Sequence, residues 1–281
     1  SLNNVIIYTT NGGTTWSMPT GATLSRSWTQ KLTASGGIGN NLCMHPYNNN
    51  TIFLVQGSTV YVSRNSGENW TNIGSVTGGG SAHSFYVSPL DTNIWVCAIT
   101  SNPDRITKTT NYGATWTTSF SANFSNYGQP LEMDQNDPSL FYFAPDDSGF
   151  YKSTDFTNFI YQSSTNGYYG IDLLFTDYEN AVVYTTLMEK RILKTSDGGA
   201  SFVNSSGIPV YNTNVGSVLG MLAKVNSEIF AVRGGNVLKS IDNGFSFAPS
   251  FSPGDGNLEL IVKSEKAENN ITSVYMISKY G

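Results

Sequence analysis

The chain has 281 residues, of which 12% are charged and 13% aromatic, and its formal net charge at pH 7 is −5. No Lys/Arg run is longer than the pair Lys190-Arg191, which excludes the basic surface that nucleic acid requires. No apolar stretch reaches the roughly 18 residues that span a bilayer, so we expect no membrane insertion. A chain of this length could form two domains, but single domains also reach it, and we expect one domain over 1–281.

A short phrase recurs along the chain: Ser or Thr, any residue, Asp or Asn, any residue, Gly, and an aromatic residue two or three places on. Intact copies start at Thr9, Ser63, Thr109, Thr195 and Ser240, and a copy without the Gly starts at Ser153. The Asx side chain accepts hydrogen bonds from the backbone that follows it, and Gly permits a positive φ, so each copy predicts a tight hairpin turn. Successive copies lie 42 to 54 residues apart, a spacing typical of a four-stranded propeller blade.

A second pattern, a polar turn followed by a β-branched or aromatic run, precedes every copy of the phrase except the first. The turns fall at 45–48, 88–91, 134–138, 176–179, 224–226 and 265–268, and the runs that follow them at 52–55, 94–97, 140–143, 182–184, 229–232 and 274–277. Each turn is expected between the first and second strands of a blade. No helical periodicity persists, so the predicted class is all-β.

The two ends of this pattern complement each other. The last turn has no phrase after it, and the first phrase has no turn before it. We therefore expect strands around 258–262 and 274–278 to share a blade with strand 5–9 and the segment after Trp16. The prediction is a single six-bladed β-propeller of four-stranded antiparallel blades, whose shared blade closes the ring and removes free sheet edges.

The repeated phrase resembles the Asp-box, or BNR, repeat of sialidases, sortilin-type receptors, xyloglucan-cleaving hydrolases and a photosystem II assembly factor, all of them β-propellers. The resemblance implies that the phrase joins the third and fourth strands of a blade, on the face opposite to the binding site. It also implies that ligands meet the other face, called the loop face below. That face is formed by the turns between second and third strands and by the loops from each fourth strand to the next first strand.

Aromatic and basic side chains on the loop face are the candidates for ligand binding. Aromatic rings stack on sugars and anchor protein partners, and the arginine guanidinium pairs with carboxylates. The predicted ligand-binding residues are Trp28, Tyr127, Tyr168, Tyr169, His83, Arg105, Arg191 and Arg233. Sialidases bind a carboxylate with three arginines on this face, but the chain has no Arg-Ile-Pro-type segment near its start and no assignable Tyr/Glu nucleophile pair, which argues against that activity.

Glycoside hydrolysis requires two carboxyl groups roughly 5 to 10 Å apart. The catalytic candidates are Asp172, Glu259 and Asp147, and the further carboxylates expected on the loop face are Asp104, Asp146, Glu189 and Asp255. Asp172 is expected at the start of an inner strand, where desolvation would raise its pKa. Asp147 lies in a segment whose composition is that of an ordinary turn.

The two histidines and two cysteines have no metal-ligand spacing. His45 is expected to be a structural residue of a His-Pro turn, and His83 to start an inner strand. Cys43 and Cys97 fall on different strands, and we favour free thiols over a disulfide because free Cys behaves as a small hydrophobe. We expect no metal and no cofactor.

Three functions remain open. The leading hypothesis is a non-catalytic, secreted or cell-surface propeller that binds a glycan or a protein partner through its loop face, because no complete catalytic set can be assigned. The alternatives are a xyloglucanase-like or sialidase-like glycoside hydrolase, and a structural or assembly module of a larger surface complex. The weakly charged composition, rich in Asn, Thr and Tyr, is typical of a bacterial extracellular protein, and this is the location we expect.

Overall fold

The computed structural model describes most of the chain. The described residues are 5–9, 14–15, 17, 30–33, 41–124, 131–134, 136–145, 149–163, 171–177, 180–185, 192–208, 222–233, 236–252, 258–263 and 274–278. Some of them are described by their backbone alone: 5–9, 171–172, 182–185, 233, 258–263 and 274–278. Contacts divide the chain into two compact units. We call Ser27–Gly170 the central unit, and Ser1–Arg26 with Ile171–Gly281 the terminal unit.

All regular structure in the described residues is β-strand, as the sequence predicted. The strands coincide with the β-branched and aromatic runs, which fit a pleated, half-buried surface. No helix in the described part of the chain is long and apolar enough to cross a bilayer.

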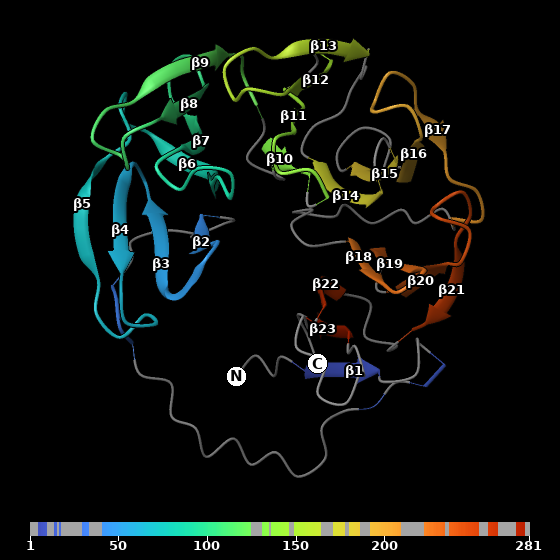
Figure 1. Cartoon of the computed structure of the whole chain (residues 1–281). Coiled ribbons are helices and arrows are strands. Elements are labelled where there is room, and N and C mark those ends of the chain that lie inside the picture. The colour runs from blue at the N-terminus through green and yellow to red at the C-terminus, as the bar shows by residue number, and fades with distance from the viewer. Residues whose placement is uncertain are drawn as a thin grey trace. The chain divides into compact units, whose positions relative to one another are not determined.

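The central unit contains three four-stranded antiparallel sheets, each formed by four consecutive strands (Figure 1). The first sheet consists of β2 (Leu42–His45), β3 (Asn48–Gln56), β4 (Thr59–Ser63) and β5 (Thr71–Ser75). The second consists of β6 (Ser81–Val87), β7 (Trp95–Thr100), β8 (Arg105–Thr109) and β9 (Thr117–Ser121). The third consists of β10 (Leu131–Met133), β11 (Phe141–Phe143), β12 (Phe150–Ser153) and β13 (Ile160–Ser163).

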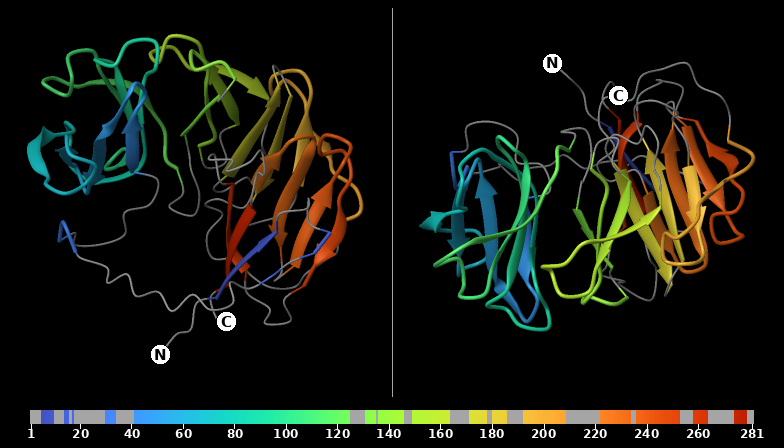
Figure 2. Two further views of the ribbon diagram at one scale, coloured as in Figure 1. Left: turned by 60° about the horizontal axis from the view of Figure 1, so that its bottom comes forward. Right: turned by 90° about the horizontal axis from the view of Figure 1, so that it is seen from above.

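The terminal unit contains two further four-stranded sheets, which lie side by side (Figure 2). The first consists of β14 (Ile171–Asp177), β15 (Asn180–Thr185), β16 (Ile192–Thr195) and β17 (Val203–Asn204). The second consists of β18 (Leu222–Val225), β19 (Glu228–Arg233), β20 (Asn236–Ser240) and β21 (Ala248–Phe251).

The two ends of the chain share a sheet. This three-stranded sheet has the order β1 (Val5–Thr9), β23 (Val274–Ser278), β22 (Leu258–Lys263). β1 pairs antiparallel with β23, so that Val5 lies opposite Ser278. The predicted pairing of the N-terminal and C-terminal strands is confirmed, whereas the count of six blades and the closure of the ring stay predictions.

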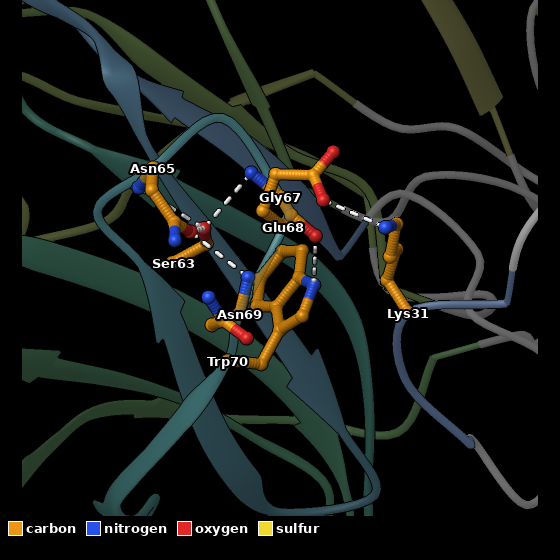
Figure 3. A network of polar contacts seen from close by, with 7 residues as sticks. All are labelled: Lys31, Ser63, Asn65, Gly67, Glu68, Asn69 and Trp70. Carbon is orange, nitrogen blue, oxygen red and sulfur yellow. Dashed lines mark hydrogen bonds and ion pairs between the residues drawn. The ribbon is translucent and has the colours of Figure 1, made fainter.

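The repeated phrase forms the turn between the third and fourth strands of each four-stranded sheet, and we call it the repeat turn. In the turn between β4 and β5, Gly67 N–H donates to Ser63 Oγ at 2.8 Å and Asn69 N–H donates to Asn65 Oδ1 at 2.9 Å (Figure 3). The Trp70 indole closes the turn by donating to Gly67 O at 3.0 Å. The two side-chain acceptors therefore satisfy backbone donors that the strand ladder cannot reach.

The repeat turns differ from the sequence prediction in one respect. Positive φ was expected at the Gly, but the residue before it is also left-handed: φ is 57° at Ser66 and at Tyr112, and 58° at Asn243. Non-glycine residues accept this conformation here because the two flanking side-chain hydrogen bonds fix the turn.

The last aromatic residue of a repeat turn packs between neighbouring sheets, as expected. Trp116 belongs to a buried cluster that joins the sheet β2–β5 to the sheet β6–β9. Trp95 lies at the centre of this cluster, with ring centroids 4.9 Å from Phe53 and 4.5 Å from Tyr112. The turn thus connects strand pairing within one sheet to packing against the next.

We predict that Gly113→Ala lowers the free energy of unfolding by about 2 to 4 kcal/mol, because it combines left-handed strain with overpacking. A Cβ on Gly113, where φ is 82°, would lie 2.6 Å from Trp95 Cζ3. The control is Gly79→Ala, which shares a positive φ but has no atom within 4 Å of the added Cβ, and which should cost about 1 kcal/mol. Chemical unfolding measures both, and equal losses would contradict the packing account.

Candidate functional site

The described part of the loop face contains one cluster of functional side chains, at the end of the sheet β6–β9 where β7 turns into β8. We call it the β7–β8 site, and it consists of His83, Ser101, Asp104, Arg105 and Phe124. The connection between β7 and β8 is the predicted turn between second and third strands. Residues 76–80, which link β5 to β6, pass beside it, as shown by Gly80, where a Cβ would lie 1.7 Å from Thr100 O.

Asp104 organises the turn. Its Oδ1 accepts the Ser101 N–H at 2.7 Å, and its Oδ2 accepts the Phe124 N–H at 3.2 Å. Both carboxylate oxygens are therefore committed to backbone donors, one in the turn and one in the segment after β9. Asp104 therefore supplies negative charge to the site and holds its shape through these two bonds.

Arg105 lies half-buried at the start of β8. Its Nε donates to Ser101 Oγ at 2.9 Å, and Ser101 Oγ in turn donates to Pro103 O at 2.6 Å. The guanidinium lies against Gly78, where a Cβ would come within 2.5 Å of Nη1. Among the described residues no carboxylate forms an ion pair with Arg105. The guanidinium is thus held by one bond while its terminal amino groups remain donors for an anion.

His83 is placed by an irregularity in β6. Ala82 lies opposite Ile99 and Ser84 opposite Ala98, so His83 is the extra residue of a β-bulge. Bulges change the direction of a side chain, and here the half-buried imidazole meets Phe124 edge to face at 6.1 Å. Burial lowers the pKa of His83, and the Asp104 carboxylate, which raises it, only partly offsets this. At neutral pH the ring is an uncharged donor and acceptor.

Of the predicted ligand-binding residues, the structure describes the side chains of His83 and Arg105: His83 meets Phe124, and Arg105 meets Ser101 and Gly78. Arg233 on β19 is described by its backbone alone, and Trp28, Tyr127, Tyr168, Tyr169 and Arg191 lie outside the described residues. These six positions stay predictions.

The predicted catalytic carboxylates are not tested by the described side chains. Asp172 lies on β14 opposite Tyr184, and Glu259 lies on β22, but both are described by their backbone alone. Asp147 lies outside the described residues.

The sequence reasoning missed the contribution of Ser101 and Gly78, which hold the Arg105 side chain. A signal for the second was present in the run Gly78-Gly79-Gly80, because side-chain-free backbone allows close approach by a neighbouring group. The described residues contain no group of three His, Cys, Asp or Glu that could hold a metal ion.

The cysteines and His45 have structural roles. Cys43 is half-buried and Cys97 fully buried, and both are free thiols. Burial raises the pKa of each thiol, which disfavours the reactive thiolate. His45 Nδ1 accepts the Tyr47 N–H at 3.1 Å, which confirms its role in the turn.

We predict that Asp104→Asn lowers the pKa of His83 further, because it removes the negative charge that favours the imidazolium. Since the pKa of folded His83 lies below that of the unfolded residue, about 6.5, the folded state loses stability as the pH falls below this value. Asp104→Asn should make the free energy of unfolding fall more steeply as the pH falls below about 6.5. NMR titration of the two histidines measures the shift, with His45 as internal reference and Asp91→Asn, in the turn between β6 and β7, as control. An unchanged or raised His83 pKa would contradict the assignment.

No protein-family model matches the chain, and no curated protein matches its sequence. Its structure is similar to known β-propeller proteins. For the GH74 xyloglucanase from Xanthomonas campestris the TM-score is 0.58 at 13% identity, covering 91% of this chain and 46% of that one. For an ancestral GH74 enzyme the TM-score is again 0.58 at 13% identity, with coverages of 96% and 40%. For YCF48 from Cyanidioschyzon merolae it is 0.54 at 13% identity, with coverages of 84% and 81%.

These similarities confirm the predicted β-propeller fold. At 13% identity they carry the fold alone. The chain spans less than half the length of either GH74 enzyme.

Proposed function

We propose that the protein is a non-catalytic β-propeller that binds a carboxylate-bearing glycan or protein partner through its loop face. The observation that carries this proposal is the Arg105 guanidinium, held by Ser101 and Gly78 with no carboxylate partner among the described residues. A fixed guanidinium with free terminal donors suits bidentate recognition of a planar carboxylate.

The architecture that we propose is a closed ring of six blades of the Asp-box type, in a secreted or cell-surface protein. Five four-stranded sheets and the sheet shared by β1, β22 and β23 would supply the six blades. The repeat turns support the Asp-box assignment, because a hydroxyl and an Asx side chain accept backbone N–H groups at the same positions in successive sheets.

We favour binding over hydrolysis because the β7–β8 site holds one carboxylate, Asp104, whereas hydrolysis of a glycoside needs two. Both oxygens of Asp104 already accept backbone N–H groups. A glycoside hydrolase, xyloglucanase-like or sialidase-like, is the alternative, and it would require a carboxylate pair formed elsewhere, with Asp172, Glu259 and Asp147 as candidates. An assembly role, as part of a larger surface complex, is the corresponding alternative for a protein partner.

We predict that Arg105→Ala weakens binding of an acidic partner by about tenfold or more, since it removes a charge-assisted pair worth more than about 1.4 kcal/mol. The probes are an array of neutral, sialylated and uronic-acid glycans and a set of acidic peptides, with reducing-sugar release measured on every glycan bound. Arg64→Ala is the matched control, because Arg64 is an exposed arginine of a repeat turn. Binding by wild type and by Arg64→Ala, with no sugar release, supports the proposal. Sugar release that Asp172→Asn abolishes would replace binding by hydrolysis.

A further inference from the structure

A pocket of about 490 Å³ opens in the terminal unit, at the repeat-turn end of the sheet β18–β21. Its lining residues are Lys224, Asn226, Ser227, Ile241, Asp242 and Asn243. It lies between the turn that joins β18 to β19 and the repeat turn that joins β20 to β21. None of its residues was singled out as a ligand-binding candidate by sequence.

The same junction is closed in two other sheets. In the sheet β2–β5, Ser66 N–H donates to Asn50 O at 2.8 Å, and in the sheet β6–β9, Tyr112 N–H donates to Asn93 O at 3.0 Å. Each bond connects the repeat turn to the beginning of the second strand, at Asn50 in β3 and at Asn93 just before β7. The chain's own backbone carbonyl therefore fills this position in both sheets.

Among the described residues, the corresponding bond is missing in the sheet β18–β21, as it is in the sheet β10–β13, where Phe156 and Ser139 take these positions and the repeat lacks its Gly. Ser227 takes the position of Asn50. Each lies two residues before an isoleucine, and that isoleucine pairs with the first residue of a repeat turn: Ile229 with Ser240, and Ile52 with Ser63. Asn243 takes the position of Ser66, but within the described residues its N–H donates to no acceptor. An unpaired, preoriented backbone donor therefore faces the pocket.

The connection between the first two strands is shorter here than in the two closed sheets. Lys224 lies opposite Ile229 with four residues between them, whereas Met44 lies opposite Ile52, and Val87 opposite Trp95, with seven residues between them in each case. In the sheet β6–β9 the connection runs from Ser88 to Ile94 and reaches the repeat turn. The shorter turn stops before the repeat turn, and the space left is the pocket.

The surface around the pocket is unusually apolar for a repeat turn. Ile241 has 76% of its surface exposed, whereas the equivalent positions hold Arg64, Thr110, Thr154 and Ser196. Phe245 is 49% exposed, and the equivalent positions of the other intact described turns hold Glu68, Ala114 and Ala200. Ile241 lines the pocket, and Phe245 lies in the same repeat turn with Lys194 Nζ 5.7 Å from its ring centroid. Exposed apolar side chains in one turn are typical of a protein-binding surface.

The charged groups of the pocket are already engaged. Lys224 Nζ donates to Thr176 O, and Asp242 Oδ1 accepts the Ser246 N–H at 2.9 Å. Their charges also oppose each other, so the pocket has no net field that would select an ion. The groups left for a ligand are neutral: the Asn243 N–H, the two asparagine amides and the Ser227 hydroxyl.

We propose that this pocket binds a peptide segment of a partner protein, which supplies the connection that the short β18–β19 turn lacks. A backbone carbonyl of the peptide accepts the Asn243 N–H, as Asn50 O and Asn93 O accept the equivalent donors. An apolar side chain of the peptide packs on Ile241 and Phe245. The site is independent of Arg105, and it stands whether or not the loop face binds an acidic partner.

The test is a selection of phage-displayed twelve-residue peptides on the whole chain, with counter-selection on Asn243→Tyr. Tyrosine at this position fills the pocket without a new backbone conformation, since Tyr112 has a φ of 57° at the equivalent position. Asn243→Gly keeps both the N–H and the space, because Gly198 has a φ of 67° at its own equivalent position. Ser66→Tyr is the matched control in a sheet whose junction is closed. Thermal unfolding of each variant establishes that it folds.

We expect selected peptides to bind wild type, Asn243→Gly and Ser66→Tyr within about threefold of one another, and Asn243→Tyr at least tenfold more weakly. Their binding should shift the Asn243 amide resonance in NMR spectra. Peptides that bind Asn243→Tyr as well as wild type, or a selection that yields none, would overturn the proposal. The proposal would also be overturned if a neutral xyloglucan oligosaccharide shifted the Asn243 resonance and no selected peptide did. The pocket would then be a glycan site.

Discussion

The fold depends on one small set of hydrogen bonds, repeated from sheet to sheet. A Ser or Thr hydroxyl accepts the N–H of the turn glycine, at 2.8 Å for Gly67, 3.1 Å for Gly113, and 2.9 Å for Gly199 and Gly244. An Asx oxygen accepts the N–H four residues after it, at 2.9 Å in each of the same turns. Without these acceptors each turn would leave backbone donors unpaired, at a cost of about 1 to 3 kcal/mol for each one that is buried. The bonds also direct the last aromatic residue, such as Trp116, into the core between sheets.

This constraint separates the two ends of each sheet. At the repeat-turn end, side chains and backbone form the hydrogen bonds that hold the turn. In the two closed junctions the Ser66 and Tyr112 N–H groups are also paired, with backbone carbonyls. At the other end, the connections carry no repeated pattern and are free to hold residues such as Arg105. The β18–β19 pocket differs from these two junctions: the repeat turn keeps its own bonds, but the Asn243 N–H has no acceptor within the described residues, and the space beside it is open.

The elements were predictable from the sequence because their causes are local. The turns at 45–48 and 88–91, the strands after them and the position of each repeat turn follow from spacing, Asx residues and β-branched runs. The β-bulge at His83, the contact of Arg105 with Gly78 and the missing bond of Asn243 were not predictable. Each depends on the distance between segments far apart in the chain, and single-residue patterns carry no such distance. The sequence placed His83 and Arg105 on the same face but gave no indication that Asp104 is committed to backbone donors.

Amide hydrogen exchange of the whole chain, read residue by residue, tests the central claim most directly. The account predicts slow exchange for the turn glycines Gly67, Gly113, Gly199 and Gly244, although each lies outside a strand, because their N–H groups are held by a hydroxyl in a packed junction. Asn243, which has no acceptor among the described residues, should exchange faster than Tyr112 at the equivalent position. Fast exchange of the four glycines, at the rate of an unstructured peptide, would contradict the claim that the repeat turns hold the fold.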